Sequence, residues 1–265
     1  MSKVLEGKVI IVTGAGRGVG AGIAKLAAAE GAKVIVNDLG GDERGEGGDL
    51  GPAAQTVAEI KAAGGEATAN GNNIASFEGA QQLVDMAIKT YGDLDGIVNN
   101  AGILRDTIFH KMTEAEWDAV IAVNLKGCFN TSRAAAPHFK EKQKGAFVHM
   151  SSTSGLIGNF GQANYAAAKL GVAGLSKSIA LDMQRFGVRS NCIAPFAWTR
   201  LVGTIPATPE NAARLEANKK MTPEKIAPFT IALLSDQAKD VSGQLFGVRM
   251  NEIYLFSQPR PIRSV

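Results

Sequence analysis

Residues 13–20 read Thr13-Gly14-Ala15-Gly16-Arg17-Gly18-Val19-Gly20, and this stretch decides the fold. It follows an apolar, β-branched run at 9–12 and leads into an alanine-rich segment with helical spacing at 20–30. A strand that turns through glycines into a helix lets the backbone approach a pyrophosphate, and the helix start offers free N–H groups and a positive dipole end. The GxxxGxG spacing alone is also compatible with a simple tight turn, so the surrounding sequence must decide between the two.

Short apolar runs alternate with longer helical patterns along the rest of the chain. We expect further strands at 34–36, 66–69, 96–98, 146–150, 188–193 and 245–250, and helices at 53–63, 77–91, 113–142, 164–185 and 223–235. Continuous apolar strands separated by helices are typical of parallel sheets covered on both faces. The predicted fold is α/β, a doubly wound, Rossmann-type parallel sheet of seven strands, in a single domain over residues 1–265. Such sheets bind ligands at the carboxyl ends of their strands.

Composition excludes several classes of protein. The 265 residues are 45% hydrophobic and carry a formal net charge of +3, which does not indicate nucleic-acid binding. No apolar run is long enough for a membrane span, and the N-terminus does not resemble a signal peptide. Two cysteines and three histidines without ligand spacing predict neither a disulfide framework nor a metal site. We therefore expect a cytoplasmic protein with a small-molecule substrate.

An acidic residue at the end of the second predicted strand bears on the choice of cofactor. Asp38 lies 18 positions after Gly20, where a carboxylate accepts hydrogen bonds from ribose hydroxyls and repels a 2′-phosphate. Arg17 favours the opposite choice, because its cation suits that phosphate. The fixed anion outweighs a mobile arginine, so the sequence favours NAD over NADP. The alternative for Asp38 is a carboxylate that only caps its loop.

Three side chains with acid–base potential follow the fifth predicted strand. Tyr165 and Lys169 are four residues apart on one helical face, and Ser152 precedes the tyrosine by thirteen residues at the strand end. A nearby ammonium stabilises a phenolate and lowers its pKa, which makes the tyrosine a proton acceptor for an alcohol as hydride leaves carbon. A serine hydroxyl can hold the same substrate oxygen in line. Taken alone, the Tyr/Lys pair is also compatible with an exposed helix pair.

Taken together, these motifs resemble the short-chain dehydrogenase/reductase family over nearly the whole chain. Further matching segments are Asn73-Ile74, Asn99-Asn100-Ala101-Gly102, Asn124 and Pro195. The resemblance implies a catalytic set of Asn124, Ser152, Tyr165 and Lys169, in which Asn124 holds a relay water and Lys169 also binds the nicotinamide ribose. The implied cofactor contacts are Gly14, Arg17, Gly18, Val19, Gly20, Asp38, Asn73, Ile74, Asn100, Ala101, Gly102, Tyr165, Lys169 and Pro195. The family's usual proline–glycine pair is Pro195-Phe196 here.

A narrower resemblance concerns the substrate. The glycine-rich loop at 40–51, with Ile103-Leu104-Arg105-Asp106 and Gly158-Asn159-Phe160-Gly161, is similar to the (R)-3-hydroxyacyl-CoA dehydrogenase domains of type 2 multifunctional enzymes. It implies NAD-linked oxidation of a 3-hydroxyacyl-CoA. Substrate contacts are expected from Ser152, Tyr165 and Phe196, in a substrate loop at about 196–222. Candidates there for CoA phosphates and an apolar pocket, each equally compatible with an ordinary surface or core, are Arg200, Arg214, Lys219, Lys220, Lys225, Trp198, Leu201 and Ile205.

The sequence is also compatible with two other functions, and it predicts a homo-oligomer. The chain can instead act on a hydroxysteroid or another free secondary alcohol, or serve as a non-catalytic NAD-binding scaffold. The four intact catalytic candidates argue against a scaffold. Small residues along 163–174 permit close helix packing, so we expect a homo-oligomer, a tetramer or a dimer, unless these residues pack only within the subunit.

Overall fold

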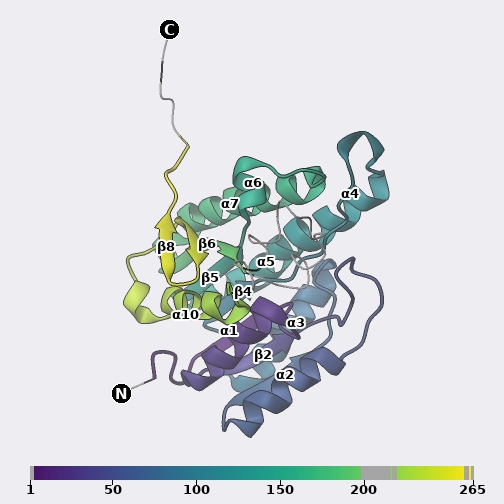
Figure 1. Ribbon diagram of the computed structural model, residues 1–265. Helices are drawn as coiled ribbons and strands as arrows, with labels where there is room; N and C mark the ends of the chain where they lie inside the picture. The colour runs from purple at the N-terminus through teal and green to yellow at the C-terminus, as the bar shows by residue number, and fades with distance from the viewer. Residues whose placement is uncertain (1–2, 198–215, 217–219, 260–262, 264–265) are drawn as a thin grey trace.

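In the described residues of the computed structural model, the strands form one sheet of eight. Figure 1 shows helices packed around this sheet. The structure describes residues 3–197, 216, 220–259 and 263. The strands follow the spatial order β3-β2-β1-β4-β5-β6-β7-β8, and only β8 runs antiparallel to its neighbour. Their bounds are β1 Val9–Thr13, β2 Lys33–Asn37, β3 Glu66–Asn70, β4 Gly96–Asn99, β5 Gly145–Met150, β6 Val188–Phe196, β7 Leu245–Arg249 and β8 Glu252–Leu255.

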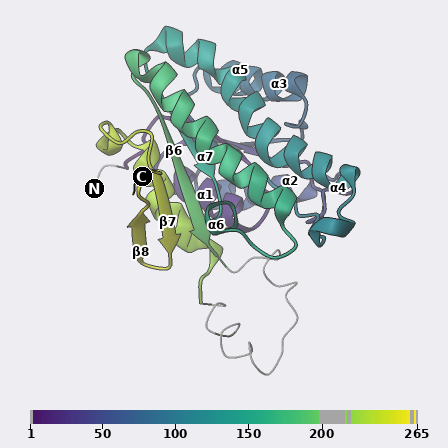
Figure 2. The ribbon, with the colours of Figure 1, turned by 90° about the horizontal axis from the view of Figure 1, so that it is seen from above.

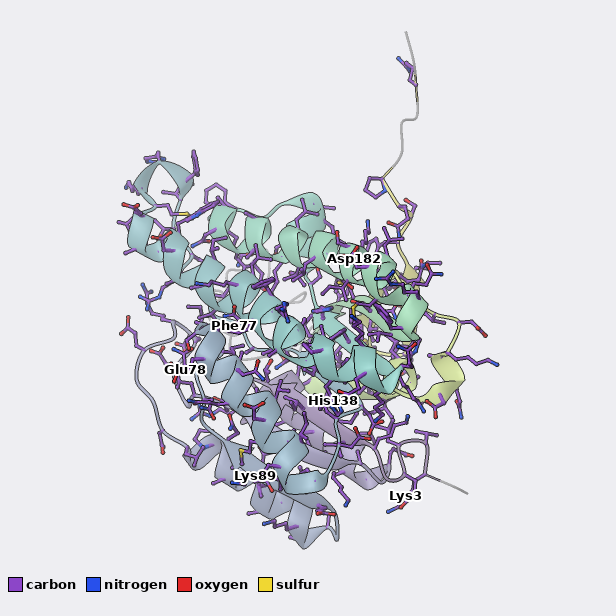
Figure 3. The ribbon with its side chains drawn as sticks, turned by 180° about the vertical axis from the view of Figure 1, so that it is seen from behind. Lys3, Phe77, Glu78, Lys89, His138 and Asp182 are labelled. Carbon is purple, nitrogen blue, oxygen red and sulfur yellow. The ribbon has the colours of Figure 1, made fainter. Side chains whose placement is uncertain are left out.

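Helices cover both faces of the sheet. The first face carries α1 (Gly18–Ala29), α2 (Gly51–Ala62) and α10 (Ala227–Leu234), which share one apolar cluster. The second face carries α3 (Phe77–Tyr91), α5 (Gly127–Lys142) and α7 (Ala163–Met183). Figure 2 shows α5 and α7 side by side, and Figure 3 shows this face from behind, with His138 on α5 and Asp182 on α7. No helix in the described ranges is long and apolar enough to span a membrane.

The shorter helical segments connect these elements. They are η1 Phe109–Lys111, α4 Glu114–Val120, η2 Ile121–Lys126, α6 Thr153–Ile157, η3 Gln184–Phe186, η4 Pro223–Ile226 and η5 Asp236–Ala238. The segment η2 has π-helical geometry and joins α4 to α5 without a break. A one-residue expansion of this kind changes which side chains face inward, and here it buries Asn124 completely.

The predicted doubly wound sheet is confirmed, with three differences in detail. The helix expected at 113–142 is a succession of α4, η2 and α5, because hydrophobic periodicity does not reveal a π-helical turn. Its predicted start is confirmed, since Thr113 and Glu116 form a reciprocal capping box. The sequence analysis expected seven strands and missed both β8 and α6. All four residues of β8 are exposed. The strand therefore has no buried face that alternating apolar and polar residues would reveal in the sequence.

A buried polar cluster joins β4, β5 and α5 beneath the carboxyl edge of the sheet. The amide nitrogen of Asn99 lies 3.1 Å from the Nδ1 atom of His149, and Thr131 donates to the amide oxygen of Asn99 at 2.5 Å. His149 is fully buried, and its Nε2 atom has no partner among the described residues. Burial, with a smaller contribution from the charge of Lys169, lowers the pKa of His149 to about 3. The imidazole is therefore neutral in the folded protein at any ordinary pH.

We expect His149 to make the protein sensitive to acid. Its pKa is near 6.5 in the unfolded chain and about 3 when folded. Below pH 6.5 the unfolded state binds the extra proton, so the free energy of unfolding falls as pH falls, by about 1.4 kcal/mol per unit for this one group. Urea unfolding between pH 7 and pH 4 should show a shallower loss in His149→Asn than in the wild type. His110→Asn, a change at an exposed position, should match the wild-type slope; equal slopes in all three proteins would contradict the assignment.

Candidate active site

A cleft of about 1060 Å³ opens at the carboxyl ends of the parallel strands, around the point where strand order reverses between β1 and β4. This is the position that doubly wound sheets offer to ligands. Fifteen of the predicted site residues line it: Gly14, Arg17, Gly18, Val19, Asp38, Asn73, Ile74, Asn100, Ala101, Gly102, Ser152, Tyr165, Lys169, Pro195 and Phe196.

The glycine-rich turn between β1 and α1 is held in shape by the end of β4. The side chain of Asn100 donates to the carbonyl oxygens of Thr13 and Gly14, at 3.0 and 2.9 Å. The Thr13 hydroxyl accepts in return from the backbone N–H groups of Asn100 and Ala101. Gly18 has a φ of +55° and open space where a Cβ would stand, so backbone alone borders the cleft there. This arrangement favours the interpretation of the segment as a phosphate-binding turn over its interpretation as a simple tight turn.

Gly20, the last glycine of the turn, is required for packing. Gly20 does not line the cleft; a Cβ there would lie 2.2 Å from the carbonyl oxygen of Gly14 and 2.5 Å from the side-chain nitrogen of Asn100. The absence of a side chain lets α1 approach the strand end closely enough to form the turn. Gly20 therefore supports the turn from behind, and its predicted contact with the cofactor stays a prediction.

Asp38 caps its loop and also lines the cleft, so the two alternatives considered for this residue do not exclude each other. Its carboxylate accepts hydrogen bonds from the backbone N–H groups of Gly16 and Gly40, at 2.8 and 2.7 Å, so it does cap the loop. The residue also lines the cleft, beside the glycine-rich turn. Because two backbone donors fix the carboxylate, its charge stays at one place in the cleft. Arg17 lies exposed at the start of α1.

Ser152, Tyr165 and Lys169 meet at the end of β5. Ser152 caps α6 by accepting from the N–H of Ser154 at 3.1 Å, which leaves its own hydroxyl proton available to an oxygen in the cleft. Tyr165 occupies the first turn of α7, and Lys169 follows one turn later. The Lys169 ammonium lies 5.6 Å from the centre of the Tyr165 ring and donates to the Met150 carbonyl at 2.7 Å. Two of its three protons remain for other acceptors.

Asn124 lies directly behind the cleft wall. Its side-chain oxygen accepts from the N–H of Ile103 at 2.9 Å, and its side-chain nitrogen donates to the Ile103 carbonyl at 3.1 Å. The amide thus helps to fix the segment that follows β4, and the residue itself does not line the cavity. The expected water relay through Asn124 stays a prediction, and the side chain's observed contacts give it a positioning role.

Hydrogen bonds to the segment after β4 and to α4 brace the start of α7. Gln162, three residues before Tyr165, donates to the Asp106 carboxylate at 2.7 Å. Asn164 donates to the carbonyl oxygens of Arg105 and Glu116, at 3.0 and 3.1 Å. Asp106 and Gln162 both line the cleft, and desolvation raises the pKa of Asp106. Only the proximity of these segments in space reveals this brace, because the bonded residues lie 48 to 59 positions apart in the chain.

The glycine-rich loop at 40–51 lies along the cleft beside Ile103. Arg105 holds it, donating to the carbonyl of Arg44 at 2.6 Å and to the carboxylate of Glu46 at 3.0 Å. Leu104 donates its backbone N–H to the Glu43 carbonyl at 2.9 Å. The loop supplies part of the wall of the cleft, a role that composition alone did not indicate.

Much of the predicted substrate loop at 196–222 lies outside the described residues. The candidates outside them are Trp198, Arg200, Leu201, Ile205, Arg214 and Lys219. Within the described part, Phe196 ends β6 and lines the cleft together with Ala197, Met221 and Pro223. The ammonium of Lys225 donates to the side-chain oxygen of Asn251 at 3.4 Å, and its contact with a CoA phosphate stays a prediction.

The chain is similar to known short-chain dehydrogenases in both sequence and structure. The short-chain dehydrogenase family profile matches residues 8–200, and the chain belongs to this family of oxidoreductases. A crystal structure of a short-chain dehydrogenase from Mycobacterium avium superimposes with a TM-score of 0.86 at 41% identity, covering 99% of this chain and 89% of that one. The family normally uses a nicotinamide cofactor, in agreement with the cleft described above.

Relatives with different activities share this degree of similarity. A short-chain type dehydrogenase/reductase of Mycobacterium tuberculosis is 44% identical over 89% of this chain and 80% of its own length. Peroxisomal multifunctional enzyme type 2 of Mus musculus is 43% identical over 92% of this chain, which spans about a third (32%) of that enzyme. The 3-oxoacyl-[acyl-carrier-protein] reductase FabG of Thermotoga maritima is 35% identical over 92% of this chain and 97% of its length.

We expect Gly20→Ala to damage the cofactor turn. The added methyl group would displace the Gly14 carbonyl or the Asn100 side chain, costing about 1–3 kcal/mol in stability and about tenfold in the affinity for the nicotinamide cofactor. Gly22→Ala in the same helix is the control, because its Cβ would only touch Glu224 at 3.4 Å. Thermal melts and cofactor titration by calorimetry measure both quantities. Equal cofactor affinity in the two variants would rule out the packing role of Gly20.

Proposed function

We propose that this protein is an NAD-dependent dehydrogenase that oxidises 3-hydroxyacyl-CoA to 3-ketoacyl-CoA. The convergence of Ser152, Tyr165 and Lys169 at the open end of a cleft carrying Asp38 is the observation that carries the proposal. These groups supply a hydroxyl donor, a proton acceptor and a cation around one position. That combination suits proton removal from a secondary alcohol as hydride leaves the same carbon.

The residues of the cleft fit a nicotinamide dinucleotide. The glycine turn would hold the pyrophosphate, Asp38 the adenosine ribose, and Asn73 and Ile74 the border of the adenine. The remaining predicted contacts line the same cleft and would border the rest of the cofactor: Asn100, Ala101, Gly102, Tyr165, Lys169 and Pro195. When bound, the cofactor supplies the acceptor for the hydride.

Tyr165 accepts the alcohol proton at its phenolic oxygen in the oxidative direction. The Lys169 ammonium, 5.6 Å from the centre of the Tyr165 ring, places a positive charge beside this proton acceptor. Ser152 donates its free hydroxyl proton to the substrate oxygen and keeps it in line with Tyr165. The same groups run the reverse reaction, with Tyr165 returning a proton to the carbonyl oxygen.

The choice of acyl-CoA as substrate is supported by the relatives. The match to peroxisomal multifunctional enzyme type 2 covers 92% of this chain. FabG, by its name, reduces a 3-oxoacyl group carried by an acyl-carrier protein rather than by CoA. Both kinds of relative point to a 3-hydroxyacyl/3-oxoacyl pair. Phe196 and the partly apolar wall of the cleft accommodate an acyl chain better than a small polar alcohol.

We also propose that the chain forms a homo-oligomer through α5 and α7. Phe129, Leu170 and Leu181 on these helices are exposed although they are large and apolar. Of the small residues on α7, Gly171 already packs on Leu125 within the subunit, whereas a Cβ at Gly174 would meet open space. Light scattering gives the mass in solution; a monomer at micromolar concentration would contradict this assembly.

We expect NADH formation with an (R)-3-hydroxyacyl-CoA. Absorbance at 340 nm is followed with NAD and a panel of both enantiomers of the thioester, free hydroxysteroids and simple secondary alcohols. Turnover confined to a thioester supports the proposal. Turnover confined to a hydroxysteroid or another free alcohol would retain the tyrosine mechanism and overturn the acyl-CoA assignment.

The variant Tyr165→Phe tests the mechanism within the same assay. Loss of the phenolic oxygen should lower kcat by about 10²- to 10⁴-fold, the usual contribution of a positioned acid–base group, while NAD still binds. Tyr91→Phe, whose hydroxyl contacts Thr68 outside the cleft, should keep full turnover. Unchanged kcat in Tyr165→Phe would exclude the proton-transfer role, and a catalytically silent wild type that binds NAD would indicate the scaffold.

We expect Asp38→Asn to shift the cofactor preference. The ratio of kcat/KM for NAD over NADP should fall by about tenfold, because the substitution removes a fixed anion beside the position of a 2′-phosphate. Asp49→Asn is the control: this carboxylate caps Gly51 at the far end of the same loop and does not line the cleft. Steady-state kinetics with both cofactors measure the ratio. A wild type that prefers NADP would refute the proposed role of Asp38.

A further inference from the structure

A second cavity lies at the opposite edge of the sheet from the cleft. Its volume is about 260 Å³, and it is formed where the amino ends of β1, β5 and β6 meet the segment that follows α10. Six charged residues line it: Lys8, Lys144, Arg189, Lys239, Asp95 and Asp236. None of them takes part in the proposed dehydrogenase chemistry.

Positive charge exceeds negative charge around this cavity. Four cations face two carboxylates, and including the neighbouring Lys142–Asp93 pair leaves the excess unchanged at two. Asp95 has both oxygens engaged, since one accepts from Lys142 at 2.7 Å and the other from the N–H of Val9 at 2.8 Å. Its negative charge is therefore compensated from outside the cavity.

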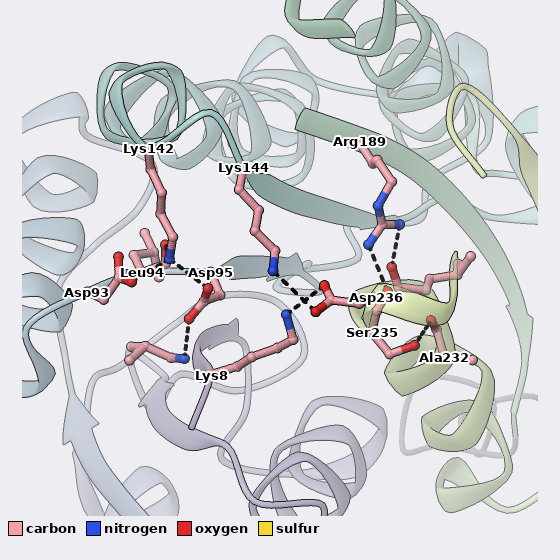
Figure 4. A network of polar contacts seen from close by, with 12 residues as sticks. Lys8, Asp93, Leu94, Asp95, Lys142, Lys144, Arg189, Ala232, Ser235 and Asp236 are labelled. Carbon is pink, nitrogen blue, oxygen red and sulfur yellow. Dashed lines mark hydrogen bonds and ion pairs between the residues drawn. The ribbon is translucent and has the colours of Figure 1, made fainter. Parts of the chain in front are cut away.

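Asp236 is the carboxylate that the cavity lysines share. Lys8 approaches one of its oxygens at 2.9 Å and Lys144 the other at 3.2 Å, as Figure 4 shows. The hydrogen bond from Lys8, followed by that from Lys144, holds the pKa of Asp236 below its ordinary value. The side chain of Lys8 is only 12% exposed, whereas those of Lys144 and Asp236 are 51% and 65% exposed, so one carboxylate at the mouth of the cavity pairs with two cations.

Arg189 and Lys239 have no carboxylate partner among the described residues. Arg189 donates to the carbonyl oxygens of Leu233 and Ser235, at 2.7 and 3.1 Å, which caps the C-terminus of α10 (Figure 4). That bonding leaves part of its five-donor guanidinium unused, and burial lowers the pKa of Arg189 although the negative charge of Asp236 acts in the opposite direction. Structural capping accounts for the position of Arg189, but it does not account for two further lysines on the same cavity.

We propose that this cavity binds a phosphate group. A tetrahedral dianion would restore charge balance, and Lys144, Lys239 and the unused donors of Arg189 are the chemistry that recognises it. The cavity has room for a phosphate with a few waters, but not for a dinucleotide. The bound anion would join β1, β5 and β6 to the segment after α10, so it would stabilise the folded state. The inference is independent of the proposed dehydrogenase activity.

Isothermal titration calorimetry with sodium phosphate tests the site. The intact protein is first saturated with NAD, so that the glycine-rich turn does not bind the added phosphate, and the buffer is a low-salt zwitterion. We expect saturable binding of one phosphate per chain, and a melting temperature that rises with phosphate concentration. Glycerol phosphate in place of inorganic phosphate distinguishes a phosphate monoester from the free ion; binding of either supports the site.

Three charge-matched variants locate the binding. Lys144→Met and Lys239→Met should each weaken phosphate binding by about tenfold, the usual effect of removing one charge-assisted hydrogen bond. Lys33→Met removes the same charge at the start of β2, outside the cavity, and should bind phosphate like the wild type. No saturable binding to the wild-type protein would overturn the proposal. Equal weakening in Lys33→Met would overturn it too, because only net charge would then matter.

Discussion

The reciprocal clamp between Thr13 and Asn100 is the interaction on which the rest of the site depends. It ties the end of β1 to the end of β4 at the one place in the sheet where strand order reverses. Chain connections leave opposite faces of the sheet there, so a crevice opens between them. The clamp fixes the carbonyl oxygens of the glycine turn, and the glycine turn in turn fixes where α1 begins. Every other wall of the cleft is placed relative to this junction.

The protein divides its polar chemistry between the two edges of the sheet. The carboxyl edge carries side chains that are positioned but incompletely bonded, such as the Ser152 hydroxyl and the Lys169 ammonium. Unused hydrogen-bonding capacity of this kind is what a ligand can take up. The amino edge carries a dense ion-pair network around Asp236, in which an excess of cations is itself the unused capacity. Both edges follow from the parallel arrangement of β1 to β7. The carboxyl ends of parallel strands lie at one side of the sheet, and their amino ends lie at the other.

Sequence patterns predicted the regular elements well and the irregular ones poorly. Buried parallel strands are continuous apolar runs, so β1, β2 and β5 were visible without a structure. No local pattern revealed the π-helical turn η2, nor that the side chain of its Asn124 forms two hydrogen bonds with the backbone of Ile103. The brace between Asp106 and Gln162 depends on contact between distant segments, which no local pattern encodes.

By itself, the sequence determined the strand–glycine–helix turn, the order of alternating strands and helices, and the residue types that define the short-chain dehydrogenase family. Each of these depends on neighbours within a few residues, because backbone turns and helical spacing are local properties. Only the tertiary structure decided that Asp38 both caps its loop and faces the cleft, that Gly20 supports the turn from behind, and that four cations gather at the amino edge. Those features arise where segments from different parts of the chain meet, and burial and charge balance are set only there.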